Sequence, residues 1–277
     1  EHLNENAEAL NDLFETRNDA VHWGEARVRV DAHGRLAEEE GITAWTTELH
    51  STPLDIAGWL KGTVNVLYKH RIYVSATLSV GGEFKSIIER FGLEAEHDRL
   101  QPVTGIYPSP FDFRKQALLA VPHDMRLPDP VLRVDPLYIE QQSDHIAELA
   151  TVSEGRMMVL FTSNLMMREM LPRLQSRLQP KGILVLSQTD AGRSALIDRL
   201  REAPRKGEKM VLLGLRAFWE GVDITGEALS VLVVSKLPFD YHGHPVYQAK
   251  KRFYEAQGFD RDYFRERVVP NVFLHLR

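Results

Sequence analysis

The fold of this chain is decided by residues 210–223, which read MVLLGLRAFWEGVD. Residues 210–213 are a short apolar run of the length typical of a strand buried on both faces. A Trp next to Glu, Gly and Asp follows this run, and Gly221 permits a positive φ or a close approach of the backbone to a ligand. The stretch therefore predicts a buried strand that is followed, after a short turn, by a loop of polar groups.

The same pattern of an apolar run, a polar turn and a helical stretch recurs from residue 71 onward. The apolar runs are 72–74, 157–161, 183–186, 210–213 and 231–234, and the helical stretches are roughly 84–91, 165–178, 191–202 and 245–257. Apolar strands that alternate with helices predict an α/β fold with a parallel sheet and helices on both faces. The carboxyl ends of such strands meet at one edge, where open α/β sheets bind ligands.

The first 70 residues have a different organisation. Residues 3–20 are predicted as an amphipathic helix, 21–33 and 43–50 as strands, and 53–67 as a helix, with a turn at 31–34. A proline-rich stretch over 100–150 is predicted as an irregular connection that ends in a helix near 138–150.

Small polar side chains follow two of the predicted strands. Ser75 and Thr77 follow the run at 72–74, where hydroxyls can bind a carboxylate or a water held by phosphate; the alternative is that they cap the chain. Thr162, Ser163 and Asn164 open a predicted helix, whose free N–H groups and positive dipole end suit a nucleic-acid phosphate. Helix capping is again the alternative interpretation.

The loop after the strand at 210–213 carries the strongest candidates for chemistry. Glu220 and Asp223 can orient a water molecule or accept a hydrogen bond from a ribose hydroxyl. Trp219 can stack on a base, or it can pack into the core, and the sequence leaves both interpretations open.

Asp240, His242 and His244 lie close together in the sequence and suggest a metal-dependent hydrolase as a minor alternative. A polar loop is the simpler interpretation of this group. We therefore predict no metal ligands in this chain.

Composition limits the possible partners. The chain has 34 Lys and Arg against 39 Asp and Glu, a formal net charge of -5, so any contact with nucleic acid is expected in a local groove. With no Cys, it contains no disulfide, Cys-ligated zinc or iron–sulfur cluster, which fits a reducing cytoplasm. No stretch approaches the roughly 20 apolar residues of a membrane span, so no membrane partner is expected.

Several catalytic motifs are absent from the 277 residues. The sequence has no G-x-x-x-x-G-K-[ST] to cradle phosphates and no Asp-Glu pair at a strand end to hold Mg²⁺. It also lacks the G-x-S-x-G of a serine hydrolase.

Taken in order, five segments resemble the DinG family of superfamily 2 DNA helicases, which is related to XPD. Residues 217–223 are the most specific and are similar to motif V. The others are 74–79, similar to motif III; 109–113, similar to the Ser-Pro-Phe segment; 159–163, similar to motif IV; and 236–239, similar to the tract after motif V. The resemblance runs from about Trp23 to the last residue.

The resemblance implies a domain organisation. Residues 1–20 would be the end of an arch-like helical insertion, 21–78 the C-terminal strands of the first motor domain, and 79–277 a RecA-like second motor domain. The P-loop and the Mg²⁺-binding motif are expected before Glu1, and motif VI with its arginine finger after Arg277.

The resemblance also implies an activity, which is ATP-dependent 5′→3′ translocation on single-stranded DNA in repair or replication. ATP and Mg²⁺ would lie between the two motor domains, bound mostly by the first. By this resemblance, Glu220, Gly221 and Asp223 line the nucleotide cleft, Ser75 and Thr77 couple the γ-phosphate to domain closure, and Thr162, Ser163, Asn164 and Trp219 contact the strand.

Two alternatives remain open at this point. The chain could be a RecA-like module that binds DNA or protein without catalysis. Within the helicase interpretation, the whole protein could be an unwinding enzyme or a fusion with an exonuclease domain.

Overall fold

The computed structural model describes residues 19–28, 38–39, 42–43, 45–94, 101–129, 131–132, 134–258 and 262–276. The predicted turn at 31–34 and nearly all of the predicted helix at 3–20 lie outside the described residues. The chain forms two compact units. We call Pro108–Pro238 the sheet unit, and the residues up to Tyr107 together with those from Phe239 onward the hairpin unit.

The sheet unit is built on four parallel strands in the order β6-β7-β5-β8. Their bounds are β5 Met157–Leu160, β6 Ile183–Ser187, β7 Lys209–Gly214 and β8 Val231–Val234. All four were predicted from their apolar runs. β5 and β7 are central and almost fully buried, which is why they contain no alternating polar positions.

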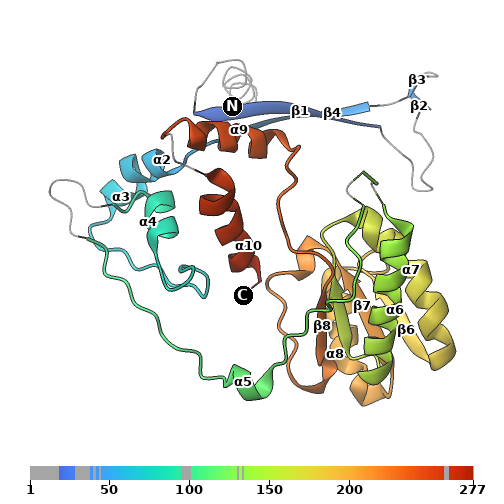
Figure 1. Ribbon diagram of the computed structural model, residues 1–277. Helices are drawn as coiled ribbons and strands as arrows, with labels where there is room; N and C mark the ends of the chain where they lie inside the picture. The colour runs from blue at the N-terminus through green and yellow to red at the C-terminus, as the bar shows by residue number, and fades with distance from the viewer. Residues whose placement is uncertain are drawn as a thin grey trace. The chain divides into compact units, whose positions relative to one another are not determined.

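Helices cover both faces of this sheet, as the sequence predicts (Figure 1). α6 (Pro136–Val152) and α7 (Asn164–Leu178) lie on one face, and α8 (Arg193–Glu202) lies on the other. Short helical turns complete the unit: α5 Phe113–Gln116, η1 Gln179–Lys181, η2 Pro204–Lys206, η3 Arg216–Phe218 and η4 Gly226–Ala228.

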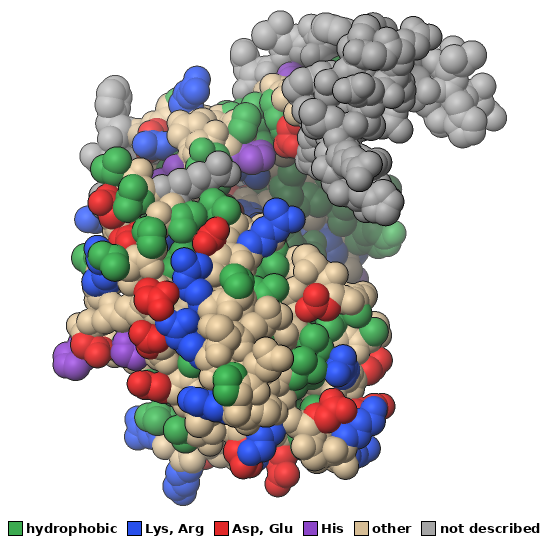
Figure 2. Space-filling model, turned by 90° about the vertical axis from the view of Figure 1, so that its right-hand side faces the viewer, with side chains coloured by type: hydrophobic (Ala, Val, Ile, Leu, Met, Phe, Trp, Pro, Cys, Tyr) green, Lys and Arg blue, Asp and Glu red, His purple; other side chains and the backbone are tan. Residues whose placement is uncertain are grey.

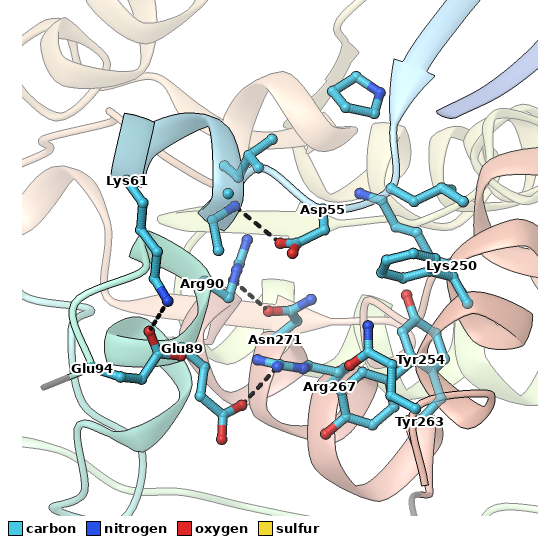
Figure 3. A pocket seen from close by; sticks show the side chains of 17 residues that line it. Asp55, Lys61, Glu89, Arg90, Glu94, Lys250, Tyr254, Tyr263, Arg267 and Asn271 are labelled. Carbon is cyan, nitrogen blue, oxygen red and sulfur yellow. Dashed lines mark hydrogen bonds and ion pairs between the residues drawn. The ribbon is translucent and has the colours of Figure 1, made fainter. Parts of the chain in front are cut away.

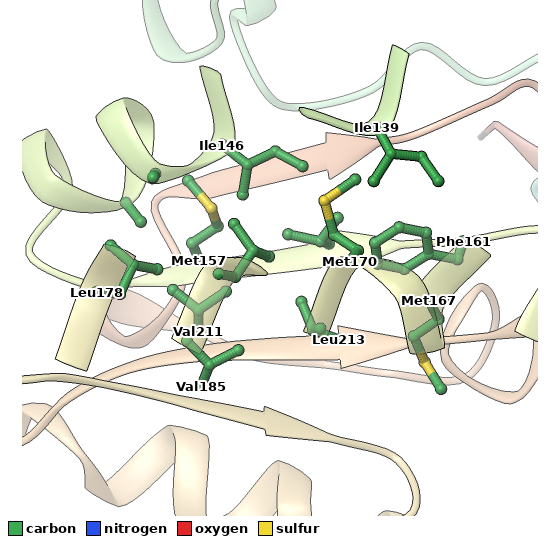
Figure 4. Packing of buried hydrophobic residues seen from close by; sticks show 14 of the residues in the cluster. Ile139, Ile146, Met157, Phe161, Met167, Met170, Leu178, Val185, Val211 and Leu213 are labelled. Carbon is green, nitrogen blue, oxygen red and sulfur yellow. The ribbon is translucent and has the colours of Figure 1, made fainter. Parts of the chain in front are cut away.

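The core of the sheet unit has two layers, because alternate residues of a strand point to opposite faces. Met157 and Val211 face α6 and α7, where Ile146, Met170 and other apolar side chains cover them (Figure 4). The next residues along each strand, Met158 and Leu212, face α8 and pack with its buried leucines.

The hairpin unit contains a long antiparallel pair, β1 (Ala20–Val28) and β4 (Trp45–Pro53), in the register Ala20 to Pro53. The remaining elements are β2 Glu38–Glu39, β3 Ile42–Thr43, α2 Ala57–Gly62, α3 Val64–Leu67, α4 Lys85–Phe91, α9 Pro245–Glu255, the π-helix η5 Phe264–Val268 and α10 Val269–His275. Tyr247, Tyr254, Tyr263 and Val268 form its small buried cluster.

Two predictions for the hairpin unit were wrong in detail. The run at 72–74 is not a strand: Ile72 is 90% exposed and Val74 is 88% exposed, and no described strand pairs with them. The predicted helix at 53–67 begins only at Ala57 and is interrupted at Thr63, whose φ of −114° and ψ of −84° leave the helical region. Among the described residues, no helix is long and apolar enough to span a membrane.

Two glycines with left-handed backbone provide a matched test of packing in the sheet unit. Gly155 has a φ of +78°, and a Cβ there would lie 2.5 Å from the Met210 backbone nitrogen. Gly182 has a φ of +69°, and a Cβ there would meet nothing within 4 Å. We expect Gly182→Ala to lower the free energy of unfolding by about 1–2 kcal/mol through strain alone. Gly155→Ala should cost at least about 1 kcal/mol more, because the backbone of β7 must shift. Urea denaturation of the two variants measures the difference, and equal losses would contradict the close packing at Gly155.

The start of α6 predicts a pH dependence of stability. The Asp135 carboxylate accepts hydrogen bonds from the amides of Leu137, Tyr138 and Asp129 and lies 3.4 Å from Arg126 Nη2. The Asp129 amide is the main cause that lowers the pKa of Asp135 from its ordinary value of 3.8, and the other partners add to it. A carboxyl whose pKa is lower in the folded state stabilises the fold above its unfolded pKa, and this contribution is lost as the pH falls through the folded pKa.

We therefore expect Asp135→Asn, which keeps one capping oxygen but loses the charge, to be less stable than the unchanged chain at neutral pH. The gap between the two free energies of unfolding should narrow below about pH 4. Denaturant titrations between neutral and strongly acidic pH measure this gap, and a gap that stays constant down to the lowest pH would contradict the role of the charge.

Candidate functional site

The carboxyl ends of β5 and β7 mark the place in the sheet unit where a ligand site is expected. These strands are neighbours, but their connections leave to opposite sides: β5 leads through α7 to β6, and β7 leads through η3 and η4 to β8. In open α/β sheets, ligands bind in the crevice at such a reversal of strand order. The loops that begin here contain residues 161–164 and 215–223, which include most of the predicted site.

A tryptophan joins these two loops. Trp219 Nε1 donates to the Phe161 carbonyl oxygen at 3.2 Å, and the indole packs against the apolar cluster on the α8 side. Of the two interpretations of Trp219, the structure shows packing. The indole N–H is hydrogen-bonded inside the protein. The strand-binding loop and the nucleotide-binding loop predicted from the sequence are therefore physically connected.

The loop after β7 owes its shape to glycine. Gly221 has a φ of +66°, as its place in the sequence suggested, and a Cβ there would lie 3.3 Å from Arg193 Nη2. Gly214, at the end of β7, is in contact with Phe218, because a Cβ at 214 would come within 2.8 Å of the Phe218 side chain. The chain turns back on itself directly after the strand, and any larger residue at 214 would force the Phe218 side chain or the local backbone to shift.

Two arginines of α8 hold the carbonyl oxygens of this loop. Arg193 Nη2 donates to the oxygens of both Glu220 and Gly221 at 2.8 Å. Arg201 donates through Nε to the Asp223 oxygen at 3.2 Å, and its Nη2 donates to the same oxygen. The side chains of Glu220 and Asp223 are exposed at the end of the sheet, where they can meet a ligand.

The residues after β5 begin a helix whose N-terminus is open to solvent. Ser163 is the N-cap of α7, and its side chain accepts from the Met166 amide at 3.4 Å. Thr162, Ser163 and Asn164 are all exposed. The first amides of a helix have no intrahelical partners, so those of Asn164 and Leu165 can bind a phosphate oxygen.

Ser75 and Thr77 lie in the hairpin unit, in a turn that follows no described strand. The Ser75 hydroxyl accepts from the Thr77 amide at 3.1 Å and lies 3.0 Å from the Thr77 hydroxyl. This local turn matches the capping interpretation, and neither residue belongs to the four-stranded sheet as the sequence had suggested.

The structure adds a loop that sequence reasoning missed. After β6, the Gln188 side-chain oxygen accepts from the Leu215 amide at 2.9 Å, and Asp190 accepts from the Ser187 amide at 2.7 Å. This loop thus supports the base of the loop after β7. The signal was present, since polar residues follow the apolar run at 183–186 as they do in the other loops.

The minor alternative of a metal-dependent hydrolase finds no support in the geometry. His244 Nδ1 accepts from the Val246 amide at 3.2 Å and caps α9, while the His242 ring stacks on Tyr247 at 4.7 Å. In the part of the chain that is described, no group of three or more His, Cys, Asp or Glu is arranged to hold a metal ion.

Charge on the surface is mixed. On the face shown in Figure 2, Lys and Arg side chains lie among Asp and Glu side chains and do not gather into one broad basic patch. This agrees with the net charge of -5 and favours local contacts to an anionic ligand.

Comparison with known proteins shows similarity to DNA helicases. Residues 146–277 match the family model described as the helicase C-terminal domain. The chain is 30% identical to the ATP-dependent DNA helicase YoaA of Haemophilus influenzae over 83% of its length, and 30% identical to the ATP-dependent helicase DinG of Mycobacterium tuberculosis over 80%. It is 29% identical over 74% of its length to a Bacillus subtilis protein named 3′-5′ exonuclease DinG.

The chain spans 33%, 31% and 21% of the length of these three relatives, respectively. The match thus concerns one part of a larger type of protein. The parallel sheet with its two helical layers is the fold expected for that part. Residues 146–277 match a helicase C-terminal domain, and the chain is similar to DinG-like helicases over most of its length.

Proposed function

We propose that this chain supplies the second motor domain of an ATP-dependent DNA helicase that moves along single-stranded DNA. The observation that carries the proposal is the Trp219–Phe161 hydrogen bond, which joins the loop after β7 to the start of α7 at the reversal of strand order. A site at which a nucleotide-facing loop and a strand-facing loop share one hydrogen bond is suited to coupling the two ligands.

In this proposal, the loop after β7 faces the nucleotide. Glu220 and Asp223 orient water and the ribose, and Gly221 lets the backbone approach the ligand, while Arg193 and Arg201 hold the loop rigid from behind. Phosphoryl transfer asks little covalent chemistry of the protein, so positioning and electrostatics account for most of the catalysis. We assign Mg²⁺ and most of the contacts to ATP to the first motor domain.

The start of α7 is the proposed contact with the strand. The Thr162 and Ser163 hydroxyls, the Asn164 side chain and the free amides of the first turn can all donate to a backbone phosphate. We propose that Trp219 transmits changes between the two loops and does not itself stack on a base, because its indole ring packs against the apolar cluster on the α8 side. Ser75 and Thr77 are proposed to respond to the γ-phosphate from the first motor domain.

Finer properties of the whole protein follow from the family resemblance alone. We infer translocation in the 5′→3′ direction, a role in DNA repair or replication, and a cytoplasmic location, which the absence of Cys fits. A translocation assay on strands of defined polarity, carried out with the whole protein, tests the direction.

The 277-residue chain by itself is expected to hydrolyse no ATP, because it contains no P-loop. Phosphate release should stay at the level of a buffer blank with and without single-stranded DNA. In the whole protein, Glu220→Gln should lower kcat by about 100-fold, because it removes a group that orients the reaction.

Turnover by the isolated chain that is stimulated by single-stranded DNA and lost in Glu220→Gln would contradict this division of labour. A whole protein that binds DNA but shows no ATP hydrolysis would favour the non-catalytic RecA-like module instead.

The chain is expected to bind single-stranded DNA weakly and with strong dependence on salt. Thr162→Val should weaken binding by about three- to ten-fold because one phosphate contact is lost, and should leave the salt dependence unchanged because that contact is uncharged. Ser176→Ala is the matched control, since Ser176 lies near the other end of α7 and is exposed.

Fluorescence anisotropy with a labelled oligothymidylate measures both effects. The proposed strand-binding role of Thr162 and its neighbours would be contradicted if the anisotropy did not rise at low salt. An equal loss of affinity in the two variants would contradict it as well.

A further inference from the structure

The hairpin unit contains a cavity of about 510 Å³ that has no part in the proposed helicase site (Figure 3). It is lined by the segment from Pro53 to Lys61, by the end of α4, and by α9, η5 and α10, and it is open to solvent. Its size lies within the usual range for small-molecule sites. All of its walls belong to the same compact unit.

The cavity has more positive than negative groups on its walls. Four cationic side chains line it, Lys61, Arg90, Lys250 and Arg267, together with three carboxylates, those of Asp55, Glu89 and Glu94. The difference is one positive charge. Which cations are already paired therefore decides what the cavity can bind.

The carboxylates are all engaged. Glu89 accepts from Arg267 Nη2 at 2.7 Å, and Glu94 lies 3.3 Å from Lys61 Nζ. Asp55 accepts from the Ala57 amide at 2.9 Å at the start of α2. None of the three pairs with Arg90 or Lys250 in any contact described.

Three donors therefore remain for a ligand. Among the described residues, Arg90 Nη1 donates only to the neutral side-chain oxygen of Asn271, at 3.1 Å. Lys250 has no hydrogen-bond or ion-pair partner among the described residues. Arg267 Nη1 is buried and, in the described structure, has no hydrogen-bond partner either.

The local backbone supports a site at this position. Arg267 lies in η5, a π-helix, and such turns are rare and frequently occur at functional sites. The Arg267 guanidinium also stacks over the Tyr254 ring at 4.8 Å, which fixes its plane. A guanidinium that is held in place loses little entropy when it binds an anion.

Electrostatics point in the same direction. Burial lowers the pKa of Lys250, and the charge of Arg90 lowers it further. Burial likewise lowers the pKa of Arg90, with a further contribution from the charge of Arg267. Asp240 offsets part of this effect at Lys250, and Glu89 pairs with Arg267, but no carboxylate contacts Arg90 or Lys250 directly among the described residues. An anion between Arg90 and Lys250 would therefore relieve the repulsion between them.

We propose that Arg90, Lys250 and Arg267 form a phosphate-binding site in this cavity, separate from the site at the ends of β5 and β7. Two guanidinium groups and one ammonium group are the donors that proteins use for phosphate. The volume exceeds that of a single phosphate, so the ligand carries its phosphate on a larger group. A free nucleotide and the backbone of a nucleic-acid strand share this chemistry.

Labelling of Lys250 tests the proposal at the site itself. The full chain is treated with an amine-acetylating reagent, and fragment-ion mass spectrometry gives the labelling rates of Lys250 and of its exposed neighbour Lys251. The probes are inorganic phosphate, ADP and a short oligothymidylate. We expect a bound phosphate to slow the labelling of Lys250 by about three-fold or more and to leave Lys251 unchanged.

Two variants make the result specific. Arg90→Gln should abolish the protection of Lys250, whereas Arg252→Gln, an exposed residue of α9 outside the cavity, should leave it intact. Protection by ADP at lower concentration than by inorganic phosphate identifies a nucleotide as the source. Protection by the oligothymidylate at a lower concentration of phosphate groups than ADP requires identifies a nucleic-acid strand as the source.

If none of the three probes protects Lys250, or if protection persists in Arg90→Gln, the proposal is wrong. The readout is independent of the proposed helicase site, because Thr162→Val should change strand binding there without changing protection of Lys250 by inorganic phosphate. Failure of one proposal is therefore distinguishable from failure of the other.

Discussion

Burial of β5 and β7 between two apolar layers is the constraint on which the rest of the sheet unit depends. Residues 157–160 and 210–214 are almost inaccessible to solvent, so every position in them is apolar or glycine. The backbone N–H and C=O groups of a strand that is buried on both faces cannot reach water. They can form hydrogen bonds only with a neighbouring strand on each side. Polar side chains therefore occur only at or beyond the ends of these strands, and the loops that follow the two central strands lie at the same edge of the sheet.

The ends of these two strands differ in what they offer. After β5, the chain enters α7 and leaves the first amides of a helix free, which suits an anion. After β7, the chain turns sharply at Gly214 and exposes the carboxylates of Glu220 and Asp223, which suit water, hydroxyls or a cation. Trp219 ties these complementary ends together through the Phe161 carbonyl.

The sequence predicted the sheet well because length and composition of the apolar runs are sufficient when a strand is buried on both faces. It failed at 72–74, because three apolar residues indicate a tendency to be buried but do not identify a pairing partner. The packing of Trp219 was left open for a related reason: its neighbour Phe161 is distant in the sequence. The cavity with Arg90, Lys250 and Arg267 could not be foreseen at all, since its walls come from segments far apart in the chain.

The anchoring of the loop after β7 by Arg193 and Arg201 has a mechanical consequence. Hydrogen bonds from charged donors are stronger than neutral ones, and here one helix holds the backbone carbonyl oxygens of Glu220, Gly221 and Asp223. The loop and α8 are therefore expected to move together as one rigid body. If a nucleotide binds at this loop, as the proposed function holds, bending is expected where the chain is less restrained, and α8 would carry the displacement to the far side of the sheet.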